Sequence, residues 1–232
     1  MKKVLGVLVL AMFAMVASGA SIVLVDNFGD SEQLTRNTAG TTNGVGVALT
    51  STAGFTRWSS LTQANTSSPL TTALNVNAPA NWWSYSSDAS IGGSASATYT
   101  SGASFDASSA LPYQFSLSLV ANSFSTPAGA LTYFIEDADG TKYTWSTSPL
   151  ANVGLPMLIQ APVASFILSA AGGTAGLDWT AIKNVGFGLD QSGNLSADTS
   201  FQNFRFAEVP EPGTYALMGA GLAALAFLRR RK

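Results

Sequence analysis

From residue 21 to residue 208 the chain repeats short segments in which apolar and polar residues alternate. The clearest segment places Tyr113, Phe115, Leu117 and Leu119 between serines and a glutamine. A period of two puts one side of a strand into a core and the other into water, which is typical of antiparallel sheets. The same pattern predicts strands over residues 22–28, 44–49, 55–58, 70–76, 82–85, 95–99, 131–135, 143–145, 165–168, 185–189 and 204–206.

Two turns interrupt this pattern. Residues 137–140 read Asp-Ala-Asp-Gly between Ile135 and Tyr143, which predicts a β-hairpin. Residues 178–182 begin with an aspartate suited to cap a helix, and they predict about one helical turn. Together with the strands, these features predict an all-β antiparallel sandwich that forms a single domain over residues 21–208.

The chain lacks two of the side chains that enzymes use most often in catalysis. The chain has no histidine and no cysteine, which excludes Ser-His-Asp and Cys-His nucleophiles, disulfides and the usual zinc sites. No pair of carboxylates stands out at a spacing suited to acid and base catalysis. We therefore predict that the protein is not an enzyme.

Charge is distributed unevenly along the chain. Six of the 11 basic residues lie at its two ends, whereas residues 21–209 contain five basic and 12 acidic residues. A surface with this negative balance repels phosphate backbones, so nucleic acid is not an expected partner. Serine and threonine supply much of the remaining polar surface.

The first 20 residues have the pattern of a secretory signal peptide. Lys2 and Lys3 precede an apolar run over residues 4–17, and the small residues Ser18, Gly19 and Ala20 follow it. This order of basic, apolar and small residues predicts export, with cleavage near Ala20. An uncleaved anchor or a buried first helix is the alternative interpretation.

Residues 209–232 form a second distinct segment. It begins with Val209, Pro210, Glu211 and Pro212, continues through an apolar stretch from Thr214 to Leu228, and ends in four basic residues. A helix over that stretch reaches about 22 Å, against about 30 Å of bilayer hydrocarbon, so it is marginal as a permanent span. The basic end is expected on the cytoplasmic side, which leaves the body outside. The basic residues are Arg229, Arg230, Arg231 and Lys232.

This segment resembles the PEP-CTERM sorting signal, a tail made of Pro-Glu-Pro, a hydrophobic helix and a basic end. The resemblance implies recognition by an exosortase, a membrane enzyme that cleaves near Pro-Glu-Pro. It also implies a bacterium that makes extracellular polysaccharide, and a place at the cell surface or in a biofilm matrix after membrane anchoring and processing. The alternative is an ordinary C-terminal anchor that happens to follow Pro-Glu-Pro.

The body has a second, looser resemblance. Residues 25–28 at its start, and residues 177–182 and 201–206 at its end, resemble the first and last elements of jelly-roll carbohydrate-binding and galactose-binding-like domains. This resemblance implies a jelly-roll sandwich and suggests sugar binding. The same scaffold also serves structural roles. Two hypotheses therefore remain for the body: a structural component of the matrix, and a carbohydrate-binding module.

The run Trp82-Trp83-Ser84-Tyr85 is the candidate ligand site. On a strand, Trp82 and Trp83 point to opposite faces, so one aromatic ring can be exposed and can stack on a sugar. The alternative is that all of these rings belong to the core. Trp58 and Trp145 are predicted to be core residues.

Carboxylates suggest a structural calcium ion at two places. Asp137 and Asp139 could supply oxygen ligands, although the same residues are also what a hairpin turn prefers. Asp26, Asp30 and Glu32 form a second candidate group, completed by a residue such as Asp198. No other cofactor is expected, and the predicted partners are an exosortase, the export machinery, the membrane and extracellular polysaccharide.

Overall fold

The structure, a computed structural model, describes residues 22–66, 69–77, 80–107, 113–123, 129–147, 156–173, 176–193 and 196–208. Within these ranges the regular elements are strands and one 3₁₀ turn, η1 (Val163–Ser165). The predicted signal helix within residues 1–20 and the predicted hydrophobic helix over residues 214–228 lie outside the described residues. In the described part, no helix is long and apolar enough to cross a membrane.

The strands form two antiparallel sheets. The seven-stranded sheet has the order β12 (Met157–Pro162), β9 (Tyr113–Ser123), β15 (Asp198–Glu208), β7 (Trp82–Ser87), β6 (Thr72–Asn77) and β2 (Glu32–Arg36), with β1 (Ile22–Asp26) paired to β15. The eight-stranded sheet has the order β13 (Ile167–Ala170), β11 (Lys142–Ser146), β10 (Ala130–Asp137), β14 (Ile182–Gln191), β8 (Gly93–Phe105), β5 (Phe55–Gln63) and β3 (Gly40–Asn43), with β4 (Val47–Ala48) paired to β5.

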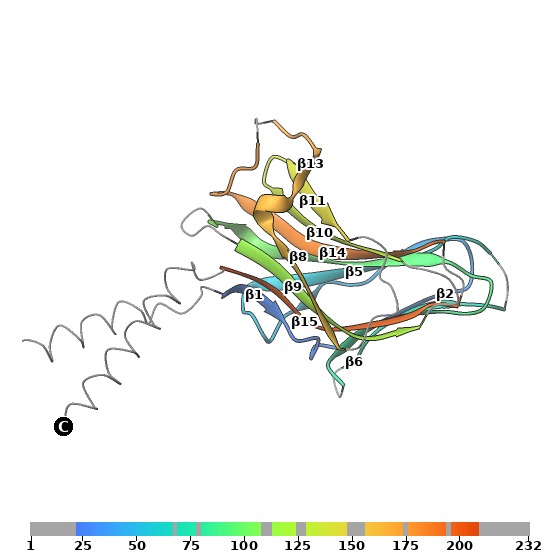
Figure 1. Ribbon diagram of the computed structural model, residues 1–232. Coiled ribbons are helices and arrows are strands. Elements are labelled where there is room, and N and C mark those ends of the chain that lie inside the picture. The colour runs from blue at the N-terminus through green and yellow to red at the C-terminus, as the bar shows by residue number, and fades with distance from the viewer. Residues whose placement is uncertain are drawn as a thin grey trace, which may run out of the picture.

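The two sheets lie face to face as the layers of a sandwich (Figure 1). The chain passes repeatedly from one sheet to the other, from β7 to β8, from β8 to β9 and from β9 to β10. Such crossings are typical of jelly-roll sandwiches. The all-β antiparallel prediction is therefore confirmed. The hairpin predicted around residues 137–140 is also confirmed, because β10 pairs directly with β11.

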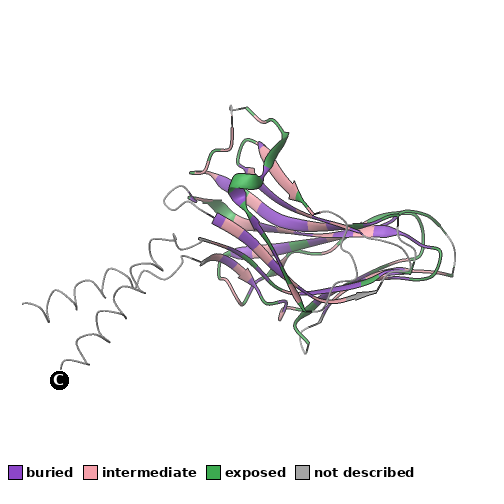
Figure 2. Ribbon diagram, in the orientation of Figure 1, coloured by how far each residue is buried: buried purple, intermediate pink, exposed green. Residues whose placement is uncertain are grey.

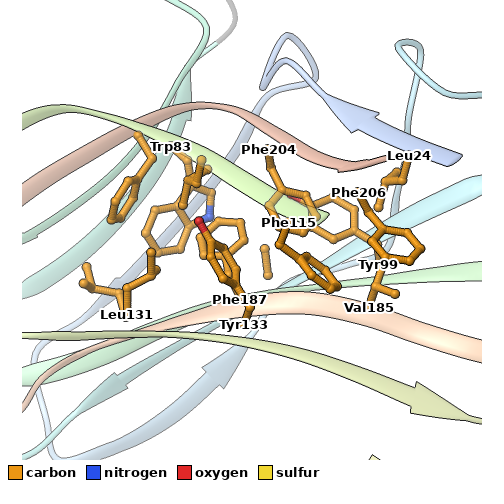
Figure 3. Packing of buried hydrophobic residues seen from close by; sticks show 14 of the residues in the cluster. Leu24, Trp83, Tyr99, Phe115, Leu131, Tyr133, Val185, Phe187, Phe204 and Phe206 are labelled. Atoms are coloured by element: carbon orange, nitrogen blue, oxygen red, sulfur yellow. The ribbon is translucent and has the colours of Figure 1, made fainter. Parts of the chain in front are cut away.

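Aromatic rings from both sheets fill the space between the layers. Tyr99 stacks on Phe204 with ring centroids 4.8 Å apart, and Phe115 lies 4.7 Å from Phe206. Figure 3 shows these rings between the strands. Buried residues alternate with partly exposed ones along the strands, as Figure 2 shows. The period of two in the sequence therefore separates the core from the surface.

The turn predicted at residues 178–182 is confirmed, as a single hydrogen-bonded turn and not as a longer helix. Asp178 does cap this segment, because its Oδ1 accepts the backbone N–H of Thr180 at 2.9 Å. The N–H of Ala181 bonds to the carbonyl of Asp178, which closes this single turn. Strand β14 begins at the next residue, Ile182, which pairs with β10 and β8. Sheet pairing on both sides ends the segment before a helix can form.

Candidate functional site

The aromatic cluster on β7 divides between core and surface. Trp83 is completely buried against Phe187 and Phe201, and Tyr85 is buried beside it. Burial raises the pKa of Tyr85 to about 12, so its phenol stays neutral. Trp82 points to the opposite face and is 37% exposed. The predicted alternation is confirmed, but Trp83 and Tyr85 cannot stack on a ligand at the surface, which corrects their assignment as ligand residues.

Trp58, predicted to be a core residue, is instead the most exposed tryptophan of the described chain, at 47%. Strand β5 turns Phe55, Arg57 and Leu61 inward, and this places Trp58 on the outer face. Phe55 and Leu61 share one phase of the alternation, so the sequence did contain the signal for this orientation. Trp145 matches its prediction more closely, because it is half-buried and stacks on Tyr133.

The outer face of the eight-stranded sheet presents side chains in rows that run across the strands. One row crosses four strands through Phe134, Gly186, Thr98 and Trp58. Three strand spacings separate its two aromatic rings, a distance of about 14 Å. The next row contains hydroxyl groups and a glycine, and it consists of Ser146, Thr132, Gly188, Ser96 and Ser60.

A shallow hollow of about 360 Å³ lies on this face. Gly188 forms part of its floor, and a β-carbon at that position would meet only Ser96, at 3.9 Å. At Gly186, by contrast, a β-carbon would lie 2.6 Å from the ring of Phe134, which covers that glycine. Because glycine has no side chain, the space above Gly188 is open. The lining includes Ser60, Ser94, Ser96, Thr132, Gly188 and Asp190.

Hydrogen-bonded polar groups border the row that contains Trp58. Asn184 donates to Glu136 Oε1 at 3.1 Å and accepts from the hydroxyl of Thr100 at 2.9 Å. The ammonium group of Lys142 lies 4.1 Å from the centre of the Phe134 ring. Glu136 and Lys142 face each other on paired strands. One acidic and one basic side chain therefore border this row, whereas the hollow lies along the neighbouring row, which contains hydroxyl groups.

Asp137 and Asp139 use their carboxylates within the hairpin turn. Asp137 Oδ1 accepts the N–H groups of Asp139 and Thr141, and its Oδ2 accepts the N–H of Asp178. Asp139 Oδ1 accepts the N–H and the hydroxyl of Thr141. Within the described ranges, no group of three or more acidic side chains could hold a metal ion. These contacts are the ones that the turn interpretation requires, and the calcium ion stays a prediction.

Arg57 occupies the place where the second calcium ion was predicted. The guanidinium and Asp26 are both fully buried, and Nη1 lies 2.6 Å from Asp26 Oδ2. Nη2 donates to the carbonyl oxygen of Asp30, and Nε lies 3.6 Å from Glu32 Oε2. The hydroxyl of Tyr99 donates to Asp26. Burial disfavours the charged guanidinium, but Asp26, Tyr99 and Glu32 together outweigh this and raise the pKa of Arg57.

The other carboxylates of that predicted calcium site have different surroundings. Asp30 accepts the N–H and the hydroxyl of Thr50. Asp198 lies on β15 opposite Ser86, and burial together with the charge of Asp88 raises its pKa. The prediction that Asp26, Asp30, Glu32 and Asp198 share one ion is therefore corrected. The cation among Asp26, Asp30 and Glu32 is a side chain of the protein.

Comparison with known proteins addresses the C-terminal segment. Residues 208–232 match the family model described as the PEP-CTERM protein-sorting motif. The chain carries a PEP-CTERM sorting motif. This motif implies export of the chain and recognition by an exosortase. Its residues Val209, Pro210, Glu211, Pro212, Arg229, Arg230 and Arg231 lie outside the described part of the structure.

Several solved structures are similar to the chain in fold. A family 11 carbohydrate-binding module of the cellulosomal cellulase Lic26A-Cel5E of Clostridium thermocellum is 14% identical, covers 84% of this chain and 99% of its own, and has a TM-score of 0.43. The module of this family and organism in complex with a β-1,3-1,4-mixed-linked tetrasaccharide is 15% identical over the same shares, with a TM-score of 0.44. PfGH50B is 16% identical over 56% of this chain and 21% of its own, with a TM-score of 0.40. No curated protein matches the chain significantly.

Proposed function

We propose that this exported protein is a non-enzymatic component of the cell surface or of an extracellular polysaccharide matrix, and that its body binds uncharged polysaccharide. The binding site is the outer face of the eight-stranded sheet. The observation that carries the proposal is the exposed ring of Trp58 on a face whose hollow is lined by hydroxyl groups.

The chemistry of this face suits a sugar ring. A tryptophan offers a flat apolar surface to the C–H groups of a pyranose, and neighbouring hydroxyl groups both donate and accept hydrogen bonds. Ligand sites commonly combine one apolar surface with a few polar groups in this way. Asp190 is the charged residue in the lining of the hollow. No basic side chain is among the described residues that line the hollow, so this carboxylate disfavours acidic polymers and favours neutral ones.

A catalytic role for the hollow has little chemical support. Hydrolysis of a glycosidic bond ordinarily needs two carboxyl groups on either side of the bond. Among the described residues that line the hollow, Asp190 is the single carboxylate. The chain also has no histidine or cysteine to act in its place. The site therefore has groups for holding a sugar and lacks the pair needed to cleave it.

A valine in place of Gly188 tests the site. We expect this variant to lose retention on neutral polysaccharide, because the new side chain fills the hollow, while its melting temperature stays close to that of the unaltered protein. Affinity electrophoresis through gels containing dextran, mannan or mixed-linked β-glucan measures the retention, with alginate as the acidic comparison. Gly102→Val is the matched control, because Gly102 lies on the same strand as Ser96 and has open space around it.

Two results would contradict the proposal. The first is equal retention of Gly188→Val and the unaltered protein. The second is that the unaltered protein is not retained by any neutral polymer, or is retained by alginate alone.

The sorting motif leads to a second prediction. We propose that the tail holds the protein at the membrane through the stretch from Thr214 to Leu228 until an exosortase cleaves near Pro210–Gly213. Mass spectrometry of the protein released by the producing cell is then expected to find a C-terminus near these residues. Released protein that still ends in Lys232 would show that processing does not occur.

A further inference from the structure

The two exposed tryptophans lie on opposite outer faces of the sandwich. Trp58 is on β5 of the eight-stranded sheet, and Trp82 is on β7 of the seven-stranded sheet. Both residues point away from the core, with 47% and 37% of their surface exposed. Figure 1 shows β5 and β15, the partner of β7, in separate layers. The binding site proposed around Trp58 therefore does not include Trp82, and its exposed ring has no role in that site.

The surroundings of Trp82 resemble those of Trp58 in chemistry. Asn75 on β6 pairs with Ser84, two residues along β7 from Trp82, so Asn75 and Trp82 are diagonal neighbours on one face. Gln33 on β2 pairs with Asn75 and extends this polar row by one strand. Amide groups thus lie next to an exposed indole ring. An amide donates and accepts hydrogen bonds, as a sugar hydroxyl requires.

A second hollow, of about 460 Å³, lies along β2 and β6 next to this row. Its lining includes Gln33, Asn75, Ser31 and Glu32. The Glu32 side chain is almost completely buried, and its Oε2 accepts the hydroxyl hydrogen of Ser59. The polar groups that the hollow presents to solvent are therefore amides and a hydroxyl, beside the apolar Val76. Such a surface matches an uncharged ligand and not an ionic one.

The segment before Trp82 is held in place. The side-chain amide of Gln202 on β15 donates to the carbonyl oxygen of Ala80 at 3.2 Å. Asn81 has a positive φ of 52°, a conformation that asparagine tolerates better than most residues. On the other side, Trp83 anchors the strand in the core. The ring of Trp82 is thus attached to a positioned backbone, which reduces the entropy that a ligand must overcome.

We propose that the body binds two chains of uncharged polysaccharide at the same time, one on each outer face, and so cross-links the polymer. This inference rests on the proposed function. The inner faces of two packed sheets are about 10 Å apart, and the outer faces are farther apart than that. One short stretch of sugar cannot reach both tryptophans. Two sites on one rigid body join separate polymer chains without any contact between protein molecules.

Stoichiometry and network formation test this inference with the full chain. Isothermal titration with a short neutral oligosaccharide, taken from the polymer that retains the protein best, is expected to give two sites per chain. Light scattering from mixtures with the long polymer is expected to rise to a maximum and then fall when excess protein saturates the sites. The Trp82→Ala variant is expected to bind one oligosaccharide per chain, to be retained on the polymer, and to produce no rise in scattering.

Leu158→Ala is the matched control. Leu158 is an exposed apolar residue at the edge of the same sheet, with 55% of its surface exposed. If scattering came from general hydrophobic aggregation, this variant would lower it as much as Trp82→Ala does, and that result would overturn the inference. A value of one site per unaltered chain, or a network that survives Trp82→Ala, would also overturn it. Such outcomes leave binding at Trp58 intact, whereas loss of all binding removes both proposals.

Discussion

Replacement of Trp58 by alanine is expected to weaken binding of neutral oligosaccharide about 30-fold at the eight-stranded sheet. Truncation of an aromatic residue at the centre of a binding site commonly costs about 2 kcal/mol of binding free energy, which corresponds to this factor. Titration in the Trp82→Ala background isolates the site, because the other face then does not contribute. The free energy of unfolding is expected to change by less than about 0.5 kcal/mol, because the ring is exposed.

Two further variants sharpen this test. Trp58→Phe keeps a flat ring and is expected to retain a large part of the affinity. Val45→Ala removes an apolar side chain that is 79% exposed in the segment before β4, and it is expected to leave affinity unchanged. An affinity for Trp58→Ala equal to that of the unaltered protein would show that the ring does not contact the sugar.

Replacement of Arg57 by methionine is expected to destabilise the fold by about 3–5 kcal/mol. The substitution removes the cation and leaves the buried carboxylates of Asp26 and Glu32 without a charged partner. For a domain of this size, such a loss lowers the melting temperature by about 10 °C. Thermal denaturation followed by circular dichroism measures the change. Arg205→Met is the control, because Arg205 is exposed on β15, and it is expected to change stability little.

A triple variant distinguishes loss of charge balance from loss of packing. Adding Asp26→Asn and Glu32→Gln to Arg57→Met removes the unpaired charges while it keeps similar side-chain volumes. This triple variant is expected to be more stable than Arg57→Met alone. If the two are equally unstable, the role of Arg57 is to fill space, and the ionic account of the cluster is wrong.

The alternation of residues predicted most of the strands because it reflects a local property. Over residues 113–119, each apolar side chain enters the core and each polar one is only partly buried. The same rule correctly assigned Trp82 and Trp83 to opposite faces. The hairpin at residues 137–140 and the sorting motif at residues 208–232 were also recognisable, since each depends on a short stretch of neighbouring residues.

The assignments that failed depended on contacts between distant segments. Trp58 was assigned to the core because tryptophan is usually buried. On its strand, however, Arg57 points inward and Trp58 points outward. Arg57 can be buried because Asp26 and Glu32 reach it from about 30 residues away. The acidic residues were therefore predicted to bind calcium, since the residue that neutralises them could not be recognised from spacing alone.

The sequence by itself determined that the chain is exported, that it carries a sorting motif, and that its body folds from short strands with one apolar side. These properties depend on residues that are neighbours in the sequence, so the alternation of side chains and the local charge are sufficient to predict them. Only the tertiary structure placed Arg57 beside Asp26 and Glu32, and only it brought Thr132, Gly188 and Ser96 together around one hollow. Sheet pairing joins strands far apart in the chain, and its register depends on the packing of the whole core.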